Sequence, residues 1–170
     1  MAEISNQPCP FCGENKCTLR EDEIDIPFFG RVFVMSLDCL ACGARKSDVE
    51  SAEEKPPCKY TLNVENEEDL NIKIVKSAGA TVKIPRIITM ESGPASIGFV
   101  TNVEGLLERV KKAIQSAGES EDDPADKKKA KNLLNKLGKV MIGREKIKII
   151  IEDPTGNSVI ISDKAQKSKI

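Results

Sequence analysis

The chain has 170 residues, a formal net charge of −1, six Cys, one Tyr, and neither His nor Trp. This length suits one ordinary domain, or a small module attached to a larger one. The missing His excludes Ser-His-Asp triads, Cys-His dyads and His-ligated metal sites, so a transition-metal site has to rest mainly on thiolates. The charge is uneven, because residues 1–50 carry −4 and residues 101–170 carry +4.

Two matching Cys-x-x-Cys-Gly segments, or knuckles, stand at residues 9–13 and 39–43, with 26 residues between Cys12 and Cys39. Two residues between thiolates let a tight turn direct both sulfurs at one ion, and the Gly after each pair provides the positive φ that such a turn needs. Four thiolates complete a tetrahedral site without an open position, which is the pattern of structural zinc. The sequence therefore predicts a zinc ribbon with one structural Zn²⁺ held by Cys9, Cys12, Cys39 and Cys42.

Two other chemistries use the same residues. Disulfides or free thiols are the plain alternative, which the doubled spacing with Gly in register disfavours. A rubredoxin-type iron site has the same knuckles, but aromatic side chains pack around it, and this chain has no Trp and one distant Tyr. Zinc is therefore favoured over iron. The remaining Cys17 and Cys58 have no Cys-x-x-Cys partner and are expected to be small, buried or partly exposed thiols.

The segment between the knuckles is strand-like and unusually apolar. Phe28, Phe29, Phe33 and Met35 supply more apolar bulk than so small a module needs for its own core. Part of this bulk is expected to cover the rest of the protein or a partner, since Phe and Met are favoured at interfaces. Phe28 and Phe29 are therefore the candidate partner-binding anchors.

A polar seam at residues 51–57 divides the chain, because its Pro-Pro pair interrupts both helices and β-ladders. We expect the zinc ribbon over residues 1–52 and a β-rich domain over residues 58–163. Short strands are predicted where apolar and polar residues alternate or β-branched residues gather, at residues 60–64, 71–76 and 81–84.

A helical hairpin is predicted within residues 102–142, because apolar residues recur there at helical spacing in two runs with a short connection. Thr101 and Glu104 form a capping-box pattern before the first helix. Asp123 offers an N-cap for the second helix, with Pro124 in its first position.

The C-terminal part is predicted to close with a β-hairpin. A β-branched strand at residues 146–152 leads through Asp-Pro-Thr-Gly-Asn, which favours a type I turn, into a strand at residues 158–162. Asp153 and Asn157 are candidate partner-binding residues in this turn, and the favoured alternative is a plain β-turn in which both bond local backbone. Residues 164–170 are expected to form a flexible tail.

Several motifs stand in the order found in the ZPR family of zinc-finger proteins. The stretch from Cys9 to Val49, with Ile-Pro-Phe-Phe leading to Val-Met-Ser before the second knuckle, resembles the zinc finger of that family. Motifs of its companion domain follow at residues 60–62, 69–71, 75–77, 80–85, 103–106 and 152–158. The resemblance covers residues 8–162 as a single module, as in archaeal-type members. It implies a mainly β fold with some α structure, in which a distorted double-stranded β-helix or β-sandwich carries the helical hairpin.

The resemblance also implies a function. Eukaryotic members carry two modules, bind translation elongation factor one alpha and assist its folding, so we expect a non-catalytic adaptor or folding factor rather than an enzyme. A nucleic-acid-binding zinc ribbon is the alternative, which the −4 charge of residues 1–50 disfavours. The N-terminus has no signal-peptide pattern and no apolar run approaches the ~18 residues of a membrane span, so we expect a cytoplasmic protein without a membrane partner.

Overall fold

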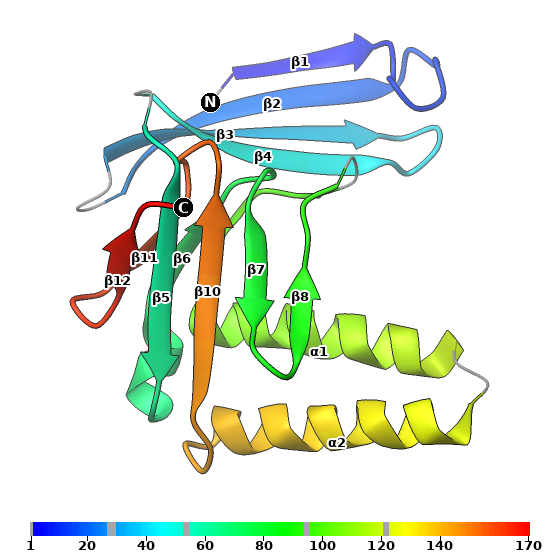
Figure 1. Cartoon of the computed structure of the whole chain (residues 1–170). Coiled ribbons are helices and arrows are strands. Elements are labelled where there is room, and N and C mark those ends of the chain that lie inside the picture. Colours follow the sequence, from blue (N-terminus) through cyan, green and yellow to red (C-terminus); the bar gives the residue numbers. More distant parts are fainter. Residues whose placement is uncertain (1, 27–29, 53–54, 94–95, 121–122) are drawn as a thin grey trace.

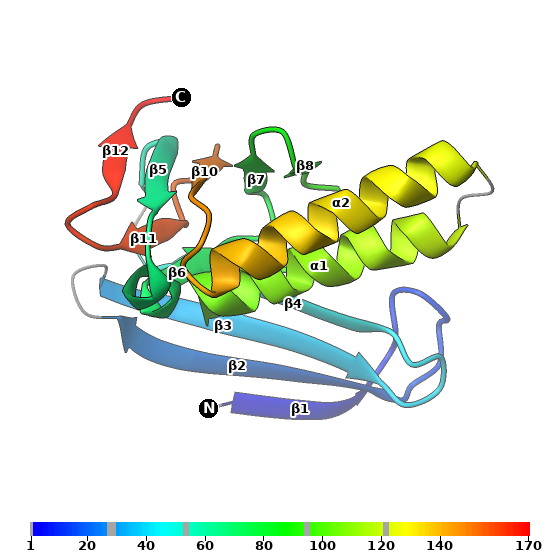
Figure 2. The same ribbon diagram turned by 90° about the horizontal axis from the view of Figure 1, so that it is seen from below.

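The computed structural model describes residues 2–26, 30–52, 55–93, 96–120 and 123–170. These residues form three β-sheets with two helices packed against each other (Figures 1 and 2). The structure is therefore mainly β with a helical hairpin, which confirms the fold class expected from the sequence.

The N-terminal sheet, here called the zinc sheet, is antiparallel with the strand order β1-β2-β3-β4. Cys17 lies opposite Cys39 at one end of the long central pair, and Ile26 lies opposite Gly30 at the other. Figure 1 shows this sheet at the top, with all other elements below it. The strands are β1 (Ala2–Gln7), β2 (Cys17–Ile26), β3 (Gly30–Cys39) and β4 (Arg45–Ser51).

The remaining strands form two sheets. The five-stranded sheet has the order β12-β5-β10-β7-β8, and the three-stranded sheet has the order β11-β6-β9. Buried and less buried residues alternate along β5 and β10, because one face of this sheet meets the core. The bounds are β5 (Cys58–Val64), β6 (Lys73–Lys76), β7 (Thr81–Ile84), β8 (Ile88–Met90), β9 (Phe99–Asn102), β10 (Ile147–Asp153), β11 (Val159–Ile161) and β12 (Gln166–Ser168), with a 3₁₀ helix at Glu67–Asn71.

The helical hairpin consists of α1 (Val103–Ser120) and α2 (Pro124–Met141). Asp123 caps α2 as expected, since its carboxylate accepts a hydrogen bond from the backbone N–H of Ala125 at 2.7 Å. The cap of α1 differs from the expected capping box. Asn102 accepts from the backbone N–H of Gly105 at 2.8 Å, because Asn is a stronger N-cap than Thr and stands one residue later.

One hydrophobic core joins all three sheets and the hairpin. Val32 and Val49 on the inner face of the zinc sheet are fully buried in the same cluster as residues of the other elements. The zinc sheet therefore shares its inner surface with the rest of the protein. The other fully buried members of this cluster include Leu62, Ile74, Leu106, Leu107, Leu137, Ile149 and Ile151.

The expected closing hairpin is wrong, because β10 and β11 belong to different sheets. β10 pairs with β5 on one side and with β7 on the other, so neither of its edges is free for β11. β11 pairs with β6 instead. The turn at residues 153–158 thus carries the chain from one sheet to the other.

The expectation of a flexible C-terminal tail is also wrong. Residues Gln166–Ser168 form β12, which pairs with the outer edge of β5. Two side-chain contacts hold this segment. Lys164 Nζ lies 2.6 Å from a carboxylate oxygen of buried Asp69, and the Lys167 ammonium lies 5.7 Å from the ring centre of Tyr60. An open sheet edge and two anchors explain why a polar segment is ordered here.

Candidate metal centre

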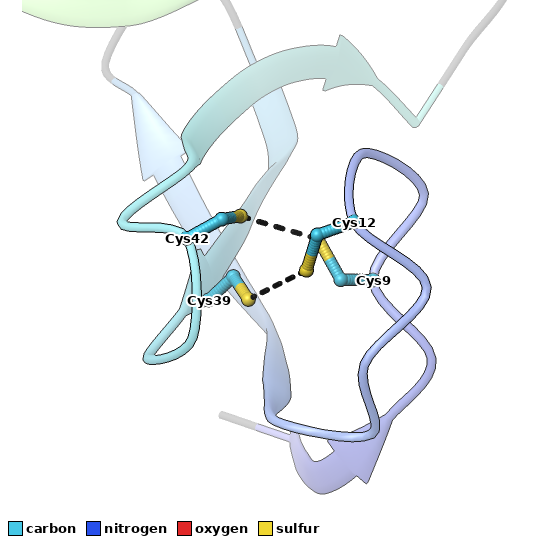
Figure 3. Close-up of side chains that lie close together, drawn as sticks. All are labelled: Cys9, Cys12, Cys39 and Cys42. Carbon is cyan, nitrogen blue, oxygen red and sulfur yellow. Dashed lines mark hydrogen bonds between the residues drawn. The ribbon is translucent and has the colours of Figure 1, made fainter.

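The four knuckle cysteines converge at one end of the zinc sheet (Figure 3). Their sulfur atoms all lie within 4.8 Å of one another. The Cys9 and Cys42 sulfurs are 3.8 Å apart, and so are those of Cys12 and Cys39. Each close pair thus joins the two knuckles, as a shared ion requires.

Local sequence determines the shape of each knuckle. The backbone N–H of Gly13 donates to the carbonyl of Cys9 at 2.8 Å, and that of Gly43 donates to the carbonyl of Cys39 at 3.0 Å. Both Gly residues have positive φ, 78° and 71°, as the Cys-x-x-Cys-Gly spacing predicts. The backbone N–H of Phe11 also points at the Cys9 sulfur, 3.4 Å away. The two turns are therefore built alike.

The sheet brings the knuckles together. The first knuckle precedes β2 and the second follows β3, and these strands pair with Cys17 opposite Cys39. One further backbone bond crosses between the two knuckle loops, from the N–H of Leu40 to the carbonyl of Lys16 at 3.0 Å. The β2–β3 pairing thus explains how sulfurs 27 residues apart come into contact.

Cys12 and Cys39 differ in acidity. Hydrogen bonds from the backbone of Cys42 and Ala41 and from neighbouring thiols, with burial opposing them, lower the pKa of Cys39 to about 7. The backbone of Glu14 lowers the pKa of Cys12, but desolvation and the other three sulfurs raise it to about 12. Crowded thiols therefore keep protons that a metal ion has to displace, which makes metal affinity fall in acid.

The geometry fits zinc. Tetrahedral Zn²⁺ with Zn–S distances of about 2.3 Å needs sulfurs roughly 3.8 Å apart, and two of the pairs have this separation. The donor set is four sulfurs, which leaves no position for a substrate or a catalytic water. The cluster Cys9, Cys12, Cys39 and Cys42 is thus suited to hold structural zinc.

The other two cysteines lie away from this set. Cys17 is fully buried behind the knuckles, where desolvation and the nearby Cys9, Cys39 and Cys42 sulfurs raise its pKa. Cys58 is buried in the main core and its thiol donates to the carbonyl of Ser158 at 3.6 Å.

Of the four candidate partner-binding residues, Phe28 and Phe29 lie outside the described residues. The other two stand in the turn after β10. Asp153 is fully buried, and its carboxylate accepts hydrogen bonds from the side chains of Ser77, Ser158 and Thr155 at 2.6 to 2.8 Å. Asp153 therefore holds the turn from inside the protein.

Asn157 connects this turn to the zinc sheet. Its side-chain oxygen accepts from the backbone N–H of Ser51, at the end of β4, at 3.1 Å. Two further contacts join β4 to the rest: Ser47 exchanges hydrogen bonds with Gly98, and Asp48 accepts from the backbone N–H of Ala78. The turn and β4 thus form a polar joint between the zinc sheet and the other sheets.

Gly156 in this turn is expected to tolerate no side chain. Its φ is +72°, and an added Cβ would lie 2.5 Å from the carbonyl oxygen of Pro56 and 2.6 Å from that of Lys55. Gly156→Ala should therefore lower the free energy of unfolding by at least about 2 kcal/mol in a denaturant titration. Gly138→Ala is the matched control, since its Cβ would meet none of the described atoms within 4 Å and helix propensity predicts a gain of about 1 kcal/mol. Equal effects of the two substitutions would contradict this account.

Two features escaped sequence reasoning. Ile4 and Leu19 are exposed on the outer face of the zinc sheet, which only the strand pairing shows. Lys76 is only 4% exposed and donates to the carbonyl of Ser77 at 2.9 Å. The sequence carried a signal for the first of these features only. The consecutive apolar residues Phe33, Val34 and Met35 place apolar side chains on both faces of β3.

The fold and the site define a class of protein, a four-thiolate zinc ribbon joined to a larger β domain with a helical hairpin. Residues 3–57 match the family model described as the ZPR1 zinc-finger domain, and residues 68–170 match the ZPR1 jelly-roll domain. The chain therefore belongs to the ZPR1 family, and the resemblance seen in its motifs is confirmed.

Relatives of this chain include archaeal and eukaryotic proteins. The ZPR1-like protein of Methanocaldococcus jannaschii is 37% identical over 165 residues, which are 96% of this chain and 83% of the relative. The ZPR1-like protein of Pyrococcus horikoshii is 38% identical over 99% of this chain and 78% of its own length. The zinc finger chaperone zpr1 of Schizosaccharomyces pombe is 35% identical over 89% of this chain, but only 33% of that relative is covered.

The family and the names of the relatives bear on two expectations, which metal is bound and whether the protein is an enzyme. Family membership and the four-cysteine cluster together indicate zinc binding, which favours zinc over the iron alternative. The printed names of the relatives describe zinc finger proteins and a chaperone, not enzymes. Among the described residues, neither helix is both long and apolar enough to cross a membrane.

Proposed function

We propose that this protein is a non-catalytic, zinc-dependent interaction module that binds translation elongation factor one alpha in the cytoplasm as an adaptor or folding factor. The observation that supports it best is the outer face of the zinc sheet, where Ile4 and Leu19 are 57% and 38% exposed on a sheet whose other face is buried at Val32 and Val49. Exposed apolar surface of this kind is typical of protein-binding sites. The chaperone name of the fission yeast relative agrees with such a role.

Zinc would act through shape in this proposal. The four thiolates leave no open coordination position, so the metal would supply folding energy to the ribbon rather than chemistry. In the sequence, the candidate anchors Phe28 and Phe29 fall between Ile26, where β2 ends, and Gly30, where β3 begins.

A pull-down from native extract tests the proposal. Immobilised protein should capture translation elongation factor one alpha, and treatment with a chelator should abolish the capture. The Phe28→Ser/Phe29→Ser double variant should lose the factor by more than tenfold while it retains one equivalent of zinc, because a hydrophobic anchor contributes binding energy but no metal ligand. Val100→Ser is the control, since Val100 is 45% exposed on β9, outside the zinc sheet. Undiminished capture by the double variant would mean that the contact lies elsewhere than at Phe28 and Phe29. Failure of the native protein to capture translation elongation factor one alpha would refute it as the partner.

A nucleic-acid partner is the second candidate, and α2 is the feature that favours it. This helix carries six Lys and one Asp, a net charge of +5, and Lys127, Lys128, Lys129 and Lys131 are exposed. The zinc ribbon itself has the opposite charge, which disfavours phosphate contacts there. Sub-micromolar RNA or DNA binding that weakens steeply with salt and is lost on Lys-to-Glu changes in α2 would support this candidate instead.

A further inference from the structure

Strand β3 carries apolar side chains on both faces of the zinc sheet. Along β3, Val32 and Val34 point inward and contact the main core, whereas Phe33, Met35 and Leu37 alternate to the other side and are only half-buried. An antiparallel sheet with one covered face normally presents polar residues on the other. The apolar outer face of β3 thus lacks the layer that would cover it among the described residues.

Strand register arranges this face in rows that run across the strands. One row is Ile4, Leu19 and Leu37, which are directly paired from β1 to β3. The next row contains Glu21 and Met35. A groove of about 430 Å³ follows these rows, lined by Ile4, Leu19, Glu21, Met35, Leu37 and Lys46. In Figure 1 the sheet that bears it lies on the opposite side of the molecule from the helices.

The backbone decides which kind of segment fits on this face. At the two apolar rows, β2 and β3 are each paired on both sides, so their N–H and C=O groups there are already bonded within the sheet. An extended peptide laid across them would leave its own backbone groups unpaired against an apolar surface, which is costly. An α-helix bonds its own backbone. Three interstrand spacings of about 4.8 Å give a crossing of about 14 Å, which roughly ten helical residues span.

The charged residues around the groove indicate which charge the bound segment carries. Glu21 lines the groove, and the next row, Glu23 and Glu50 on either side of Phe33, adds two exposed carboxylates. Two basic side chains also line the groove: Lys46 at the far end of the first row, and Arg20, which is paired with Glu3 and Asp38. Glu23 is paired with exposed Arg31 at 3.1 Å, whereas Glu21 and Glu50 face open solvent. The acidic side of the groove lies toward the β2–β3 connection, away from the knuckles.

From the apolar rows, the acidic flank and the saturated backbone, we propose that the outer face of the zinc sheet binds an amphipathic α-helix of a partner protein that carries basic residues beside its apolar stripe. The helix lies across the strands, with its apolar side chains on Leu19 and Met35 and its basic side chains toward Glu21 and Glu50. This inference rests on the proposed function, because it specifies what the client presents to the same sheet.

Two synthetic helical peptides test the inference, one with leucines and lysines and one with the same leucines and glutamates. Fluorescence anisotropy with the zinc-loaded protein should show that the lysine peptide binds at least tenfold more tightly than the glutamate peptide. The Leu19→Ser/Met35→Ser double variant should weaken the lysine peptide by at least tenfold, and Glu21→Lys/Glu50→Lys should remove its preference. Ile142→Ser is the control, since Ile142 is 50% exposed beside α2 and should leave binding unchanged.

Three outcomes would overturn the inference. Equal affinity for the two peptides would show that Glu21 and Glu50 do not attract basic residues of the helix. Tighter binding of an extended valine–lysine peptide, unaffected by Leu19→Ser/Met35→Ser, would indicate strand addition at the free edge of β1. A stable dimer in light scattering that the same double variant dissociates would show that a second copy covers the face. Capture of the elongation factor is a separate measurement, so a failed peptide test with intact capture refutes only this inference.

Discussion

Cys39→Ser is expected to abolish zinc binding and to unfold the knuckles together with the adjoining ends of β2 and β3. Structural zinc sites contribute on the order of 10–16 kcal/mol of folding energy in isolated finger peptides at neutral pH. Few other interactions stabilise this site, because among the described residues its buried cluster consists of Cys9, Cys17 and Cys39, with Leu37 and Ala44 packed against it. Metal analysis should show the loss of about one equivalent of zinc.

Amide hydrogen exchange distinguishes the two ends of the zinc sheet. Protection should vanish near Cys17 and Cys39 and decline less near Val32 and Val49, which are anchored in the main core. Strands β5 and β10 should remain protected. Cys17→Ala is the matched control, since Cys17 is a buried thiol of the same cluster that is not among the four converging sulfurs, and it should keep its metal. Unchanged amide protection around the knuckles in chelated protein would refute the prediction. A red preparation that contains iron would show that the site holds iron instead of zinc.

Asp153→Ala is expected to lower the free energy of unfolding by about 3–5 kcal/mol, because it leaves the two buried hydroxyls of Ser77 and Ser158 without an acceptor. The carboxylate of Asp153 accepts from Ser77, Ser158 and Thr155. Burial lowers the pKa of the Lys76 amine, and the negative charge of Asp153 opposes part of this effect. Urea denaturation measures the loss. Asp163→Ala is the control at an exposed Asp and should change stability by less than about 0.5 kcal/mol.

The same carboxylate makes stability depend on pH. Burial raises the pKa of Asp153, but hydrogen bonds from Ser158, Thr155 and Ser77 outweigh it and leave the folded pKa below the ordinary value. Its contribution is therefore fully present above the unfolded pKa of about 3.9 and is lost as the pH falls through the folded pKa. Asp153→Asn should flatten the acid limb of the stability curve, and an unaltered acid limb would show that other carboxylates govern it.

The shape of each knuckle was predictable because its information is local. A doubled Cys-x-x-Cys-Gly spacing specifies the turn, the positive φ of Gly13 and Gly43, and the number of ligands, whatever the rest of the fold does. The helices were predictable for the same reason, since their periodicity and the Asp123 cap act within a few residues.

Strand partnership was not predictable, because it depends on edges contributed by distant segments. The pattern of β10 indicates a strand, but only the assembled sheet shows that β5 and β7 occupy both of its edges and send β11 to β6. The order of Gln166–Ser168 has the same origin, since a polar segment becomes a strand when β5 offers it an open edge. The role of Asn157 likewise depends on Ser51, 106 residues away.

The position of Tyr60 gives the protein a built-in optical reporter. The chain has one Tyr and no Trp, so its intrinsic ultraviolet emission is dominated by this ring, which is buried in β5 beneath the Lys167 side chain of β12. The emission therefore reports on the five-stranded sheet and on the attachment of the C-terminal strand, but it does not report on the knuckles. Cobalt bound to the four thiolates would absorb in the visible range and report on the other end. Two colours of light can thus follow two parts of one unlabelled molecule as it unfolds.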